Sequence, residues 1–137
     1  MENFCQDYRK DILINRVNLL RATVNEADEL RNLLDEQIVL GSTKMVVDLS
    51  QCTHLDSTFI GVLVVTLKKL LAKGGELRLV EPLDPAKELY YLTGISKVFN
   101  NFETAEEAIK SFGPTINTTE TKSDEVIPKK NIECAFA

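Results

Sequence analysis

The chain has 137 residues, which is enough for one domain with a hydrophobic core and too few for two domains that each have a sizeable core. Hydrophobic residues make up 44% and charged residues 27% of it, so a globular fold is expected rather than a disordered chain. The formal net charge is -5, and no basic cluster is longer than two residues. We therefore do not expect the chain to bind nucleic acid, because nucleic-acid-binding proteins need a basic face to neutralise phosphates.

The beginning of the sequence has neither the basic end nor the apolar run of a signal peptide. The longest apolar stretch, residues 60–67, is interrupted by Thr66 and is far shorter than the ~20 residues of a membrane span. Cys5, Cys52 and Cys134 have neither the number nor the spacing of a disulfide framework or a zinc site. We therefore expect a cytoplasmic protein with no cofactor, no bound metal and no membrane insertion.

The first predicted elements are two strands and a helix. Residues 1–10 are expected to be an N-terminal extension. The apolar stretches 12–14 and 17–20 favour paired strands at the edge of a sheet. Asn25 is the expected N-cap of the helix, because three acids follow it at the positive end of the helix dipole, and Gly41 is the expected stop. The apolar positions of this helix recur at helical spacing: Ala27, Leu30, Leu34 and Ile38.

The middle of the chain predicts a buried strand followed by a long apolar helix. Residues 44–49 form a short apolar run without alternation, which is typical of a central strand buried on both faces. A turn over residues 50–55 leads into a helix expected to begin near Ser57 or Thr58. This helix is expected to end at about Lys73, before two glycines.

The last part of the domain predicts two strands and two helices. Residues 76–80 form the next strand, and Asp84 before Pro85 predicts an N-cap with proline at the first helical position. Gly94 closes that helix, and the apolar residues around 95–99 indicate a short last strand.

The final helix is expected to begin with a capping box over residues 104–107. The domain is therefore expected to span residues 11–113, and residues 114–137 to form a flexible polar tail. Strands alternate with helices along this order, which predicts an α/β fold in which helices cover a sheet.

A helical wheel of the segment after the central turn separates two faces. The expected core face holds Ile60, Leu63, Val64, Leu67, Leu70 and Leu71. The opposite face begins with an apolar patch of Phe59, Val62 and Val65, next to Thr66 and Lys69. Either a neighbouring segment covers this patch or the patch docks a partner. Only docking predicts that Phe59→Asp spares folding and abolishes association.

Ser57 is a hydroxyl in the first turn of this helix, where backbone N–H groups have no partner within the helix. Its side chain can simply cap the helix, a contribution of ~1 kcal/mol. A phosphate at the same place would be held by the same N–H groups and would add about -1.5 to -2 charges to the surface. The position of Ser57 alone does not decide whether it is a helix cap or a phosphorylation site that switches binding.

The acids and the single histidine do not form a catalytic set. A phosphoryl-transfer site with a nucleophilic aspartate needs a second acid to hold magnesium, and neither Asp48 nor Asp56 has one beside it. His54 is too close to Asp56 and Ser57 in the chain to favour a triad over a local hydrogen bond. The glycines at 74–75 lack the ending of a phosphate loop. No enzymatic activity is expected, and a nucleotide- or small-molecule-binding module ranks last.

Five stretches of the sequence resemble the STAS family, the domain shared by sulphate transporters and bacterial anti-sigma factor antagonists. They are Val-Asp-Leu-Ser at 47–50, Leu-Asp-Ser-Thr at 55–58, Ile-Gly-Val-Leu at 60–63, Lys-Gly-Gly-Glu-Leu at 73–77 and Leu-Thr-Gly-Ile at 92–95. They follow the family's order and spacing over roughly residues 11–112. The resemblance implies a STAS-like mixed sheet of four to five strands, with about four helices packed mainly on one face.

The resemblance also implies a function. Stand-alone members bind an anti-sigma factor, usually a serine kinase, and so free a sigma factor. The kinase phosphorylates the serine after the aspartate, which matches Ser57, with Thr58 as a secondary site, and a metal-dependent serine phosphatase reverses this. The expected role is an anti-sigma factor antagonist that phosphorylation at Ser57 switches off. The alternative is a STAS subunit that binds its partner constitutively in a transport or sensory complex.

In one position the chain departs from the family pattern, because Phe59 stands where a glycine usually follows the two hydroxyl residues. Glycine lets another backbone approach closely, whereas phenylalanine either narrows the choice of partner or adds an apolar anchor. The expected partner-binding residues are Asp56, Ser57, Thr58, Phe59, Val62, Val65, Thr66 and Lys69. The chain itself is expected to be a monomer or a weak dimer.

Overall fold

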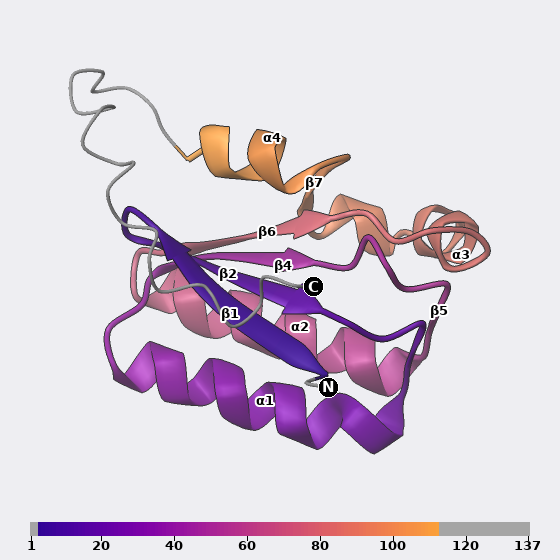
Figure 1. The fold of residues 1–137 in the computed structure, drawn as a ribbon, viewed down its shortest axis with the longest axis horizontal. Coiled ribbons are helices and arrows are strands. Elements are labelled where there is room, and N and C mark those ends of the chain that lie inside the picture. The colour runs from indigo at the N-terminus through magenta and orange to yellow at the C-terminus, as the bar shows by residue number, and fades with distance from the viewer. Residues whose placement is uncertain (1–2, 113–137) are drawn as a thin grey trace.

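The computed structural model describes residues 3–112 of the chain. Five strands form one mixed sheet in the order β1-β2-β4-β6-β7 (Figure 1). They are β1 (Phe4–Arg9), β2 (Ile12–Val17), β4 (Lys44–Asp48), β6 (Glu76–Val80) and β7 (Asn100–Phe102). β1 is antiparallel to β2, and the other neighbouring pairs are parallel. β3 (Arg21–Ala22) and β5 (His54–Leu55) pair in a separate two-stranded sheet.

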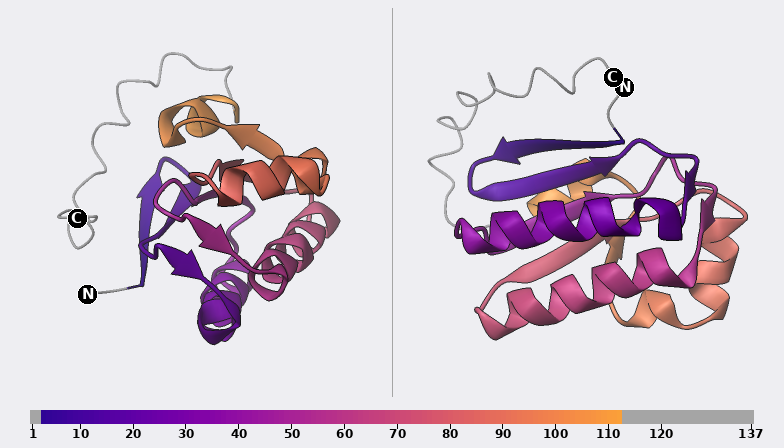
Figure 2. Two further views of the ribbon diagram at one scale, coloured as in Figure 1. Left: turned by 90° about the vertical axis from the view of Figure 1, so that its right-hand side faces the viewer. Right: turned by 90° about the horizontal axis from the view of Figure 1, so that it is seen from below.

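The long helices cover one face of the five-stranded sheet. They are α1 (Val24–Val39) and α2 (Ser57–Ala72), which lie side by side (Figures 1 and 2). α4 (Ala105–Lys110) lies on the opposite face. α3 (Ala86–Leu92) and a 3-10 turn, η1 (Ile95–Lys97), lie at the end of the sheet where β5 passes into α2. The predicted fold class is therefore confirmed.

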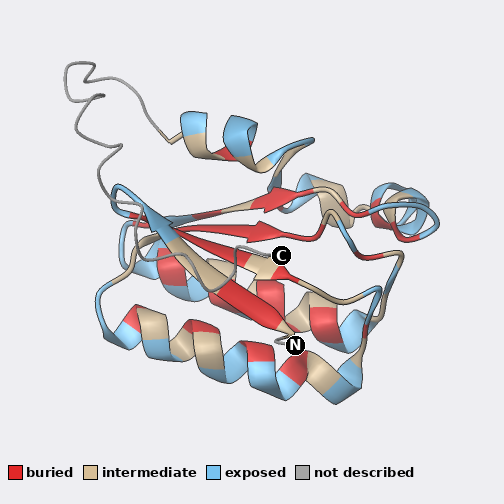
Figure 3. Cartoon of the chain, in the orientation of Figure 1, coloured by how far each residue is buried: buried red, intermediate tan, exposed pale blue. Residues whose placement is uncertain are grey.

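The hydrophobic core lies on both sides of the central strand, as the uninterrupted apolar run in β4 predicted. Met45 and Val47 belong to the larger cluster under α1 and α2. Val46 belongs to a smaller cluster that includes Ala108 of α4. Figure 3 shows buried residues along the middle of the sheet and exposed ones on the outer sides of the helices. The sheet is thus covered on one face by α1 and α2 and on the other by α4.

Two predictions for the N-terminal part were wrong. Residues 12–14 and 17–20 do not pair with each other: β2 runs unbroken to Val17, and its partner is β1, in the segment expected to precede the domain. Half of β1 is polar because it is an edge strand, so its sequence carries little strand signal. The N-cap of α1 is Thr23 and not Asn25. Thr23 and Glu26 form a capping box there.

The beginning of α3 and the start of the last strand also differ from the prediction. Pro85 occupies the N-cap position, after a cis peptide bond to Asp84, and the first turn is anchored by the N–H of Ala86 on the carbonyl of Thr53 at 3.0 Å. The strand expected near residues 95–99 is β7, which starts at Asn100, because the intervening residues form η1.

Other predicted ends were confirmed. Gly41 follows α1 and Gly94 follows α3, both with positive φ, and Thr104 caps α4 by accepting the N–H of Glu107 at 3.2 Å. The expected polar tail, residues 114–137, and Cys134 within it lie outside the described residues.

Candidate functional site

The junction between β5 and α2 is held in place by the neighbouring strand, β3. Leu55 pairs with Ala22 of β3, and the N–H of Asp56 donates to the carbonyl of Ala22 at 3.2 Å. α2 then begins at Ser57, so this residue occupies the first helical position, and its side chain is exposed. The predicted helix start near Ser57 is therefore confirmed, with the hydroxyl on the outside, although residues 54–55 form the short strand β5 rather than part of a turn.

The carboxylate of Asp56 caps α2 and also binds the start of α1. One oxygen, Oδ1, accepts the N–H of Phe59 at 3.0 Å, and Oδ2 accepts the N–H of Val24 at 2.8 Å. Both helices present unpaired N–H groups and the positive end of their dipole there, which suits a carboxylate. The cap is thus Asp56 and not Ser57, so the hydroxyl of Ser57 is not needed to cap the helix.

Asp56→Ala should destabilise the domain by about 1–2 kcal/mol, because it removes the N-cap of α2 and the acceptor for the α1 N–H together. Chemical denaturation at neutral pH measures this. Asp56→Asn is the matched control. Its amide oxygen can replace one of the two carboxylate acceptors, so this variant should lose less stability than Asp56→Ala. Equal stability of Asp56→Ala and the wild type would show that the bridging carboxylate contributes nothing.

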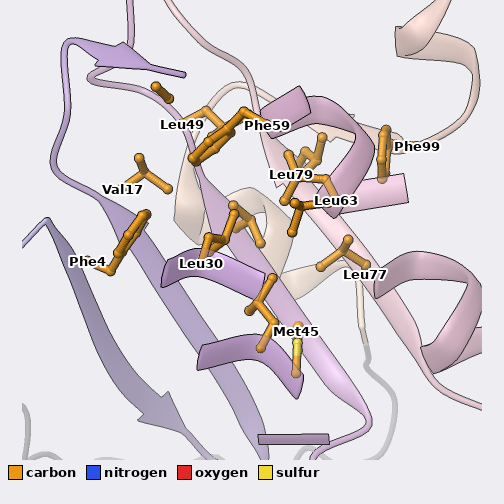
Figure 4. Close-up of a cluster of buried hydrophobic side chains, with 14 of the residues drawn as sticks. Phe4, Val17, Leu30, Met45, Leu49, Phe59, Leu63, Leu77, Leu79 and Phe99 are labelled. Atoms are coloured by element: carbon orange, nitrogen blue, oxygen red, sulfur yellow. The ribbon is translucent and has the colours of Figure 1, made fainter. Parts of the chain in front are cut away.

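The buried face of α2 lies about a quarter turn from the one that the wheel predicted. Its buried residues are Phe59, Val62, Leu63, Thr66 and Leu70. The ring of Phe59 is 0% exposed and stacks on Phe4 of β1, with centroids 6.4 Å apart (Figure 4). The assignment of Phe59, Val62 and Thr66 to a partner-binding surface was therefore wrong. The wheel was ambiguous because α2 is apolar on most sides and packs against α1 as well as the sheet.

The other predicted site residues remain at the surface. Thr58 is exposed, and Val65 is 47% exposed. Lys69 is exposed too, and its ammonium group lies 2.8 Å from the carboxylate of Asp35 on α1. Thr58 lies beside Asp56 and Ser57 in the first turn of α2, Val65 lies two turns further along, and Lys69 lies in the last turn.

An apolar groove of about 580 Å³ lies between α2 and α3. On the α2 side it is lined by Leu55, Asp56, Ser57, Ile60, Gly61, Val64 and Val65. On the other side it is lined by Ala86, Leu89, Tyr90, Thr93 and Ile95. The groove therefore starts at the predicted hydroxyl and runs along the outer side of α2. Sequence reasoning missed the α3 wall, which includes Leu89, an apolar side chain that is 56% exposed.

Polar contacts attach α3 to the end of the sheet. Glu81, which follows β6, accepts a hydrogen bond from the hydroxyl of Tyr91, and the ammonium of Lys87 lies 3.3 Å from its carboxylate. The hydroxyl of Tyr90 donates to Asn101 of β7. The hydrogen bond to Glu81 raises the pKa of Tyr91 to about 12, and burial raises the pKa of Tyr90. The wall of the groove is thus set by contacts with two strands.

The contact between Tyr91 and Glu81 should make stability fall at alkaline pH. The pKa of Tyr91 is 10.0 when unperturbed and about 12 in the folded chain. Because the pKa is higher in the folded chain, the contribution of Tyr91 to the free energy of unfolding is complete below about pH 10. It is lost as the pH rises towards 12. Tyr91→Phe should lose less stability than the wild type between pH 9 and pH 11 in urea denaturation. Identical losses would mean that the contact does not stabilise the neutral phenol.

Other reactive groups near the junction are engaged locally or buried. Nδ1 of His54 lies 3.0 Å from the hydroxyl of Thr53. Cys5 and Cys52 are buried free thiols, and burial raises the pKa of Cys52 to about 12. Within residues 3–112, no three potential metal-binding side chains cluster, and no helix is long and apolar enough to cross a membrane. The site is therefore described by two exposed hydroxyl residues, Ser57 and Thr58, one bridging carboxylate and an apolar groove.

Comparison with known proteins identifies the family. The family model of the STAS domain matches residues 21–108. A candidate anti-sigma factor antagonist of Thermotoga maritima is 30% identical over 78 residues, which are 57% of this chain and 69% of the relative.

Solved structures agree with this match. The crystal structure of a candidate anti-sigma factor antagonist from T. maritima superposes with a TM-score of 0.73 at 26% identity, covering 79% of this chain and 92% of that one. SpoIIAA of Bacillus, in its phosphorylated form, shares the fold with a TM-score of 0.63 at 18% identity, covering 80% and 98% of the two chains. The chain belongs to the STAS domain family.

Proposed function

We propose that this protein is an anti-sigma factor antagonist, a cytoplasmic regulator that binds an anti-sigma factor and so releases a sigma factor. Two features support the role. The relative from T. maritima carries this function in its name, and the surface at the start of α2 combines an exposed hydroxyl with an apolar groove. The role is one of binding, so no residue is assigned to catalysis.

The observation that carries the proposal is the position of Ser57. Its side chain is exposed at the first position of α2 and lines the apolar groove. Asp56 already caps the helix through the N–H of Phe59, so the hydroxyl is available to a kinase without loss of the cap. Ser57 is therefore the proposed phosphorylation site, with the exposed Thr58 as the secondary one.

A phosphate on Ser57 would change the surface more than the fold. It would add about -1.5 to -2 charges beside the carboxylate of Asp56 and at the edge of an apolar groove, where a partner would have to desolvate it. The positive end of the α2 dipole tolerates an anion there. Loss of the partner with retention of the fold is the expected outcome. SpoIIAA, which shares the fold, has been solved in a phosphorylated form, and this is consistent with such a state.

The proposed partner surface differs from the predicted one. It keeps Asp56, Ser57, Thr58, Val65 and Lys69, which are at least partly accessible. It leaves out Phe59, Val62 and Thr66, which are buried. It adds the α3 side of the groove, where Leu89 is 56% exposed.

The test combines the chain with its cognate anti-sigma factor kinase, ATP and magnesium, and reads the intact mass. The wild type should gain the mass of one phosphate, and the double variant Ser57→Ala, Thr58→Ala should gain nothing. Ser42→Ala, a change elsewhere on the chain, is the control and should gain the phosphate. A metal-dependent serine phosphatase should then remove it. No gain in the wild type, or a gain that survives in the double variant, would refute the phosphoswitch.

The constitutive alternative makes the opposite prediction. A STAS subunit of a transport or sensory complex should co-purify stably with a larger membrane ATPase or sensor, and Ser57→Asp should not weaken that association. Observing both results would replace the proposal by this alternative.

A further inference from the structure

Among the glycines within residues 3–112, Gly61 is the one whose presence the fold itself does not explain. Among the other described glycines, Gly41, Gly74 and Gly94 have positive φ, and at Gly75 a Cβ would lie 2.1 Å from the carbonyl oxygen of Thr43. Gly61 lies within α2 and has no such constraint. Apart from the backbone of its own helix, nothing lies within 4 Å of a Cβ built there. A glycine within a helix lowers the stability of the fold. Gly61 therefore keeps this space free while making the folded domain less stable.

The free space at Gly61 opens into the groove, in the middle of a straight stripe along α2. The stripe consists of Ser57, Ile60, Gly61, Val64, Val65 and Lys68, which recur every three or four residues and so share one side of the helix. All except Lys68 line the groove. From Ser57 to Lys68 the stripe is about 16 Å long, three turns of helix. It has a hydroxyl at one end, a cation at the other and an apolar middle.

Lys68 supplies the charge of this stripe. Its side chain is exposed and makes no ion pair with any residue in the 3–112 range. The next residue, Lys69, is turned towards α1 and is paired with Asp35. A ligand lying along the groove therefore meets an available cation one turn beyond Val64.

Both walls of the groove are mainly helical, which decides the kind of segment that fits. Binding of an extended peptide by strand addition needs free N–H and C=O groups along a sheet edge. In α2 and α3 these groups are used within the helices, apart from the ends. An apolar helix face needs no such groups, and a small residue in the groove lets the two backbones come close.

From this geometry we infer that the groove receives an amphipathic α-helix of the anti-sigma factor, whose backbone passes over Gly61 and whose acidic side chain pairs with Lys68. This inference rests on the proposed function, because it names the element of that partner. It also explains the position of the switch: a phosphate on Ser57 would lie at the other end of the same stripe, where it would repel an acidic helix.

The decisive variants are Gly61→Ala and Lys68→Glu, with the purified anti-sigma factor of the same genome as the probe in isothermal titration calorimetry. Gly61→Ala should raise Tm by roughly 4 °C, because alanine favours the helix, while it weakens Kd roughly tenfold. A substitution that raises stability while it weakens binding indicates that the original residue serves binding rather than folding. Lys68→Glu should weaken Kd roughly tenfold. Lys73→Glu, at an exposed lysine in the C-cap position of α2, should leave Kd unchanged.

The docked segment can be identified directly. A photo-crosslinking amino acid at Val65, at the edge of the groove, should join the chain to partner residues spaced three or four apart in one helix. Crosslinks to a strand or a loop would overturn the inference. So would self-association of this chain in sedimentation that Gly61→Ala abolishes, because the occupant would then be a second copy.

The failures of the two proposals are distinguishable. If the wild type binds the anti-sigma factor and Gly61→Ala and Lys68→Glu bind it equally well, the helix inference is wrong and the proposed function stands. If the wild type does not bind, the proposed function fails, and the inference fails with it.

Discussion

Phe59→Ala should destabilise the domain by about 3–5 kcal/mol, because it leaves a large cavity in the core. The side chain is fully buried and stacks on Phe4. It belongs to the main core cluster, together with Leu63 and Val17 (Figure 4). Domains of this size have total stabilities of about 5–15 kcal/mol, so the loss would remove a large fraction. Phe59→Asp, which would bury a charge in the same place, should unfold the domain.

Urea denaturation followed by circular dichroism measures this effect. Val65→Ala is the matched control on the same helix: its side chain is 47% exposed, so its change in unfolding free energy should stay within about 0.5 kcal/mol. Phe59→Leu should fall between the two, because it keeps part of the apolar volume. A folded and stable Phe59→Asp variant that had lost its partner would restore the predicted docking patch and contradict the packing described above.

A negative charge at Ser57 should weaken binding of the anti-sigma factor by about ten- to a hundredfold, in either phosphorylated chain or Ser57→Asp. The physical reason is the groove: an apolar partner segment cannot cover a charge at its rim without desolvating it. Next to it, the carboxylate of Asp56 is already negative and is held by two backbone N–H groups. The phosphorylated chain should show the larger effect, because phosphate carries more charge than aspartate.

Binding titrations of the purified proteins check this prediction. Ser57→Ala should bind like the wild type, since its hydroxyl is not the helix cap. Asn32→Asp adds the same single charge at an exposed position on α1 and should have no effect on Kd. All variants should keep the circular dichroism spectrum of the wild type. If Ser57→Asp bound as tightly as Ser57→Ala, charge at this site could not be the switch.

Local patterns in the sequence determined much of the architecture. The uninterrupted apolar run of β4 indicated a strand buried on both faces, and the hydroxyl-rich junction before α2 indicated where a helix begins. The N-cap at Thr104 and the glycines after α1 and α3 marked helix ends correctly. These signals succeed because capping, turn formation and burial of a short strand depend on neighbours within a few residues. They placed the helix start near Ser57 or Thr58.

Only the tertiary structure decided which side of α2 is buried. The helix is apolar on most sides, so its sequence is compatible with more than one rotation. Its rotation is set by packing between α1 and the sheet, and by the contact of Phe59 with Phe4 of an edge strand that has little strand signal. The α3 wall of the groove likewise depends on contacts of Glu81 and Asn101 with that helix. The sequence thus determined the hydroxyl and its place in the chain, whereas long-range packing determined the surface around it.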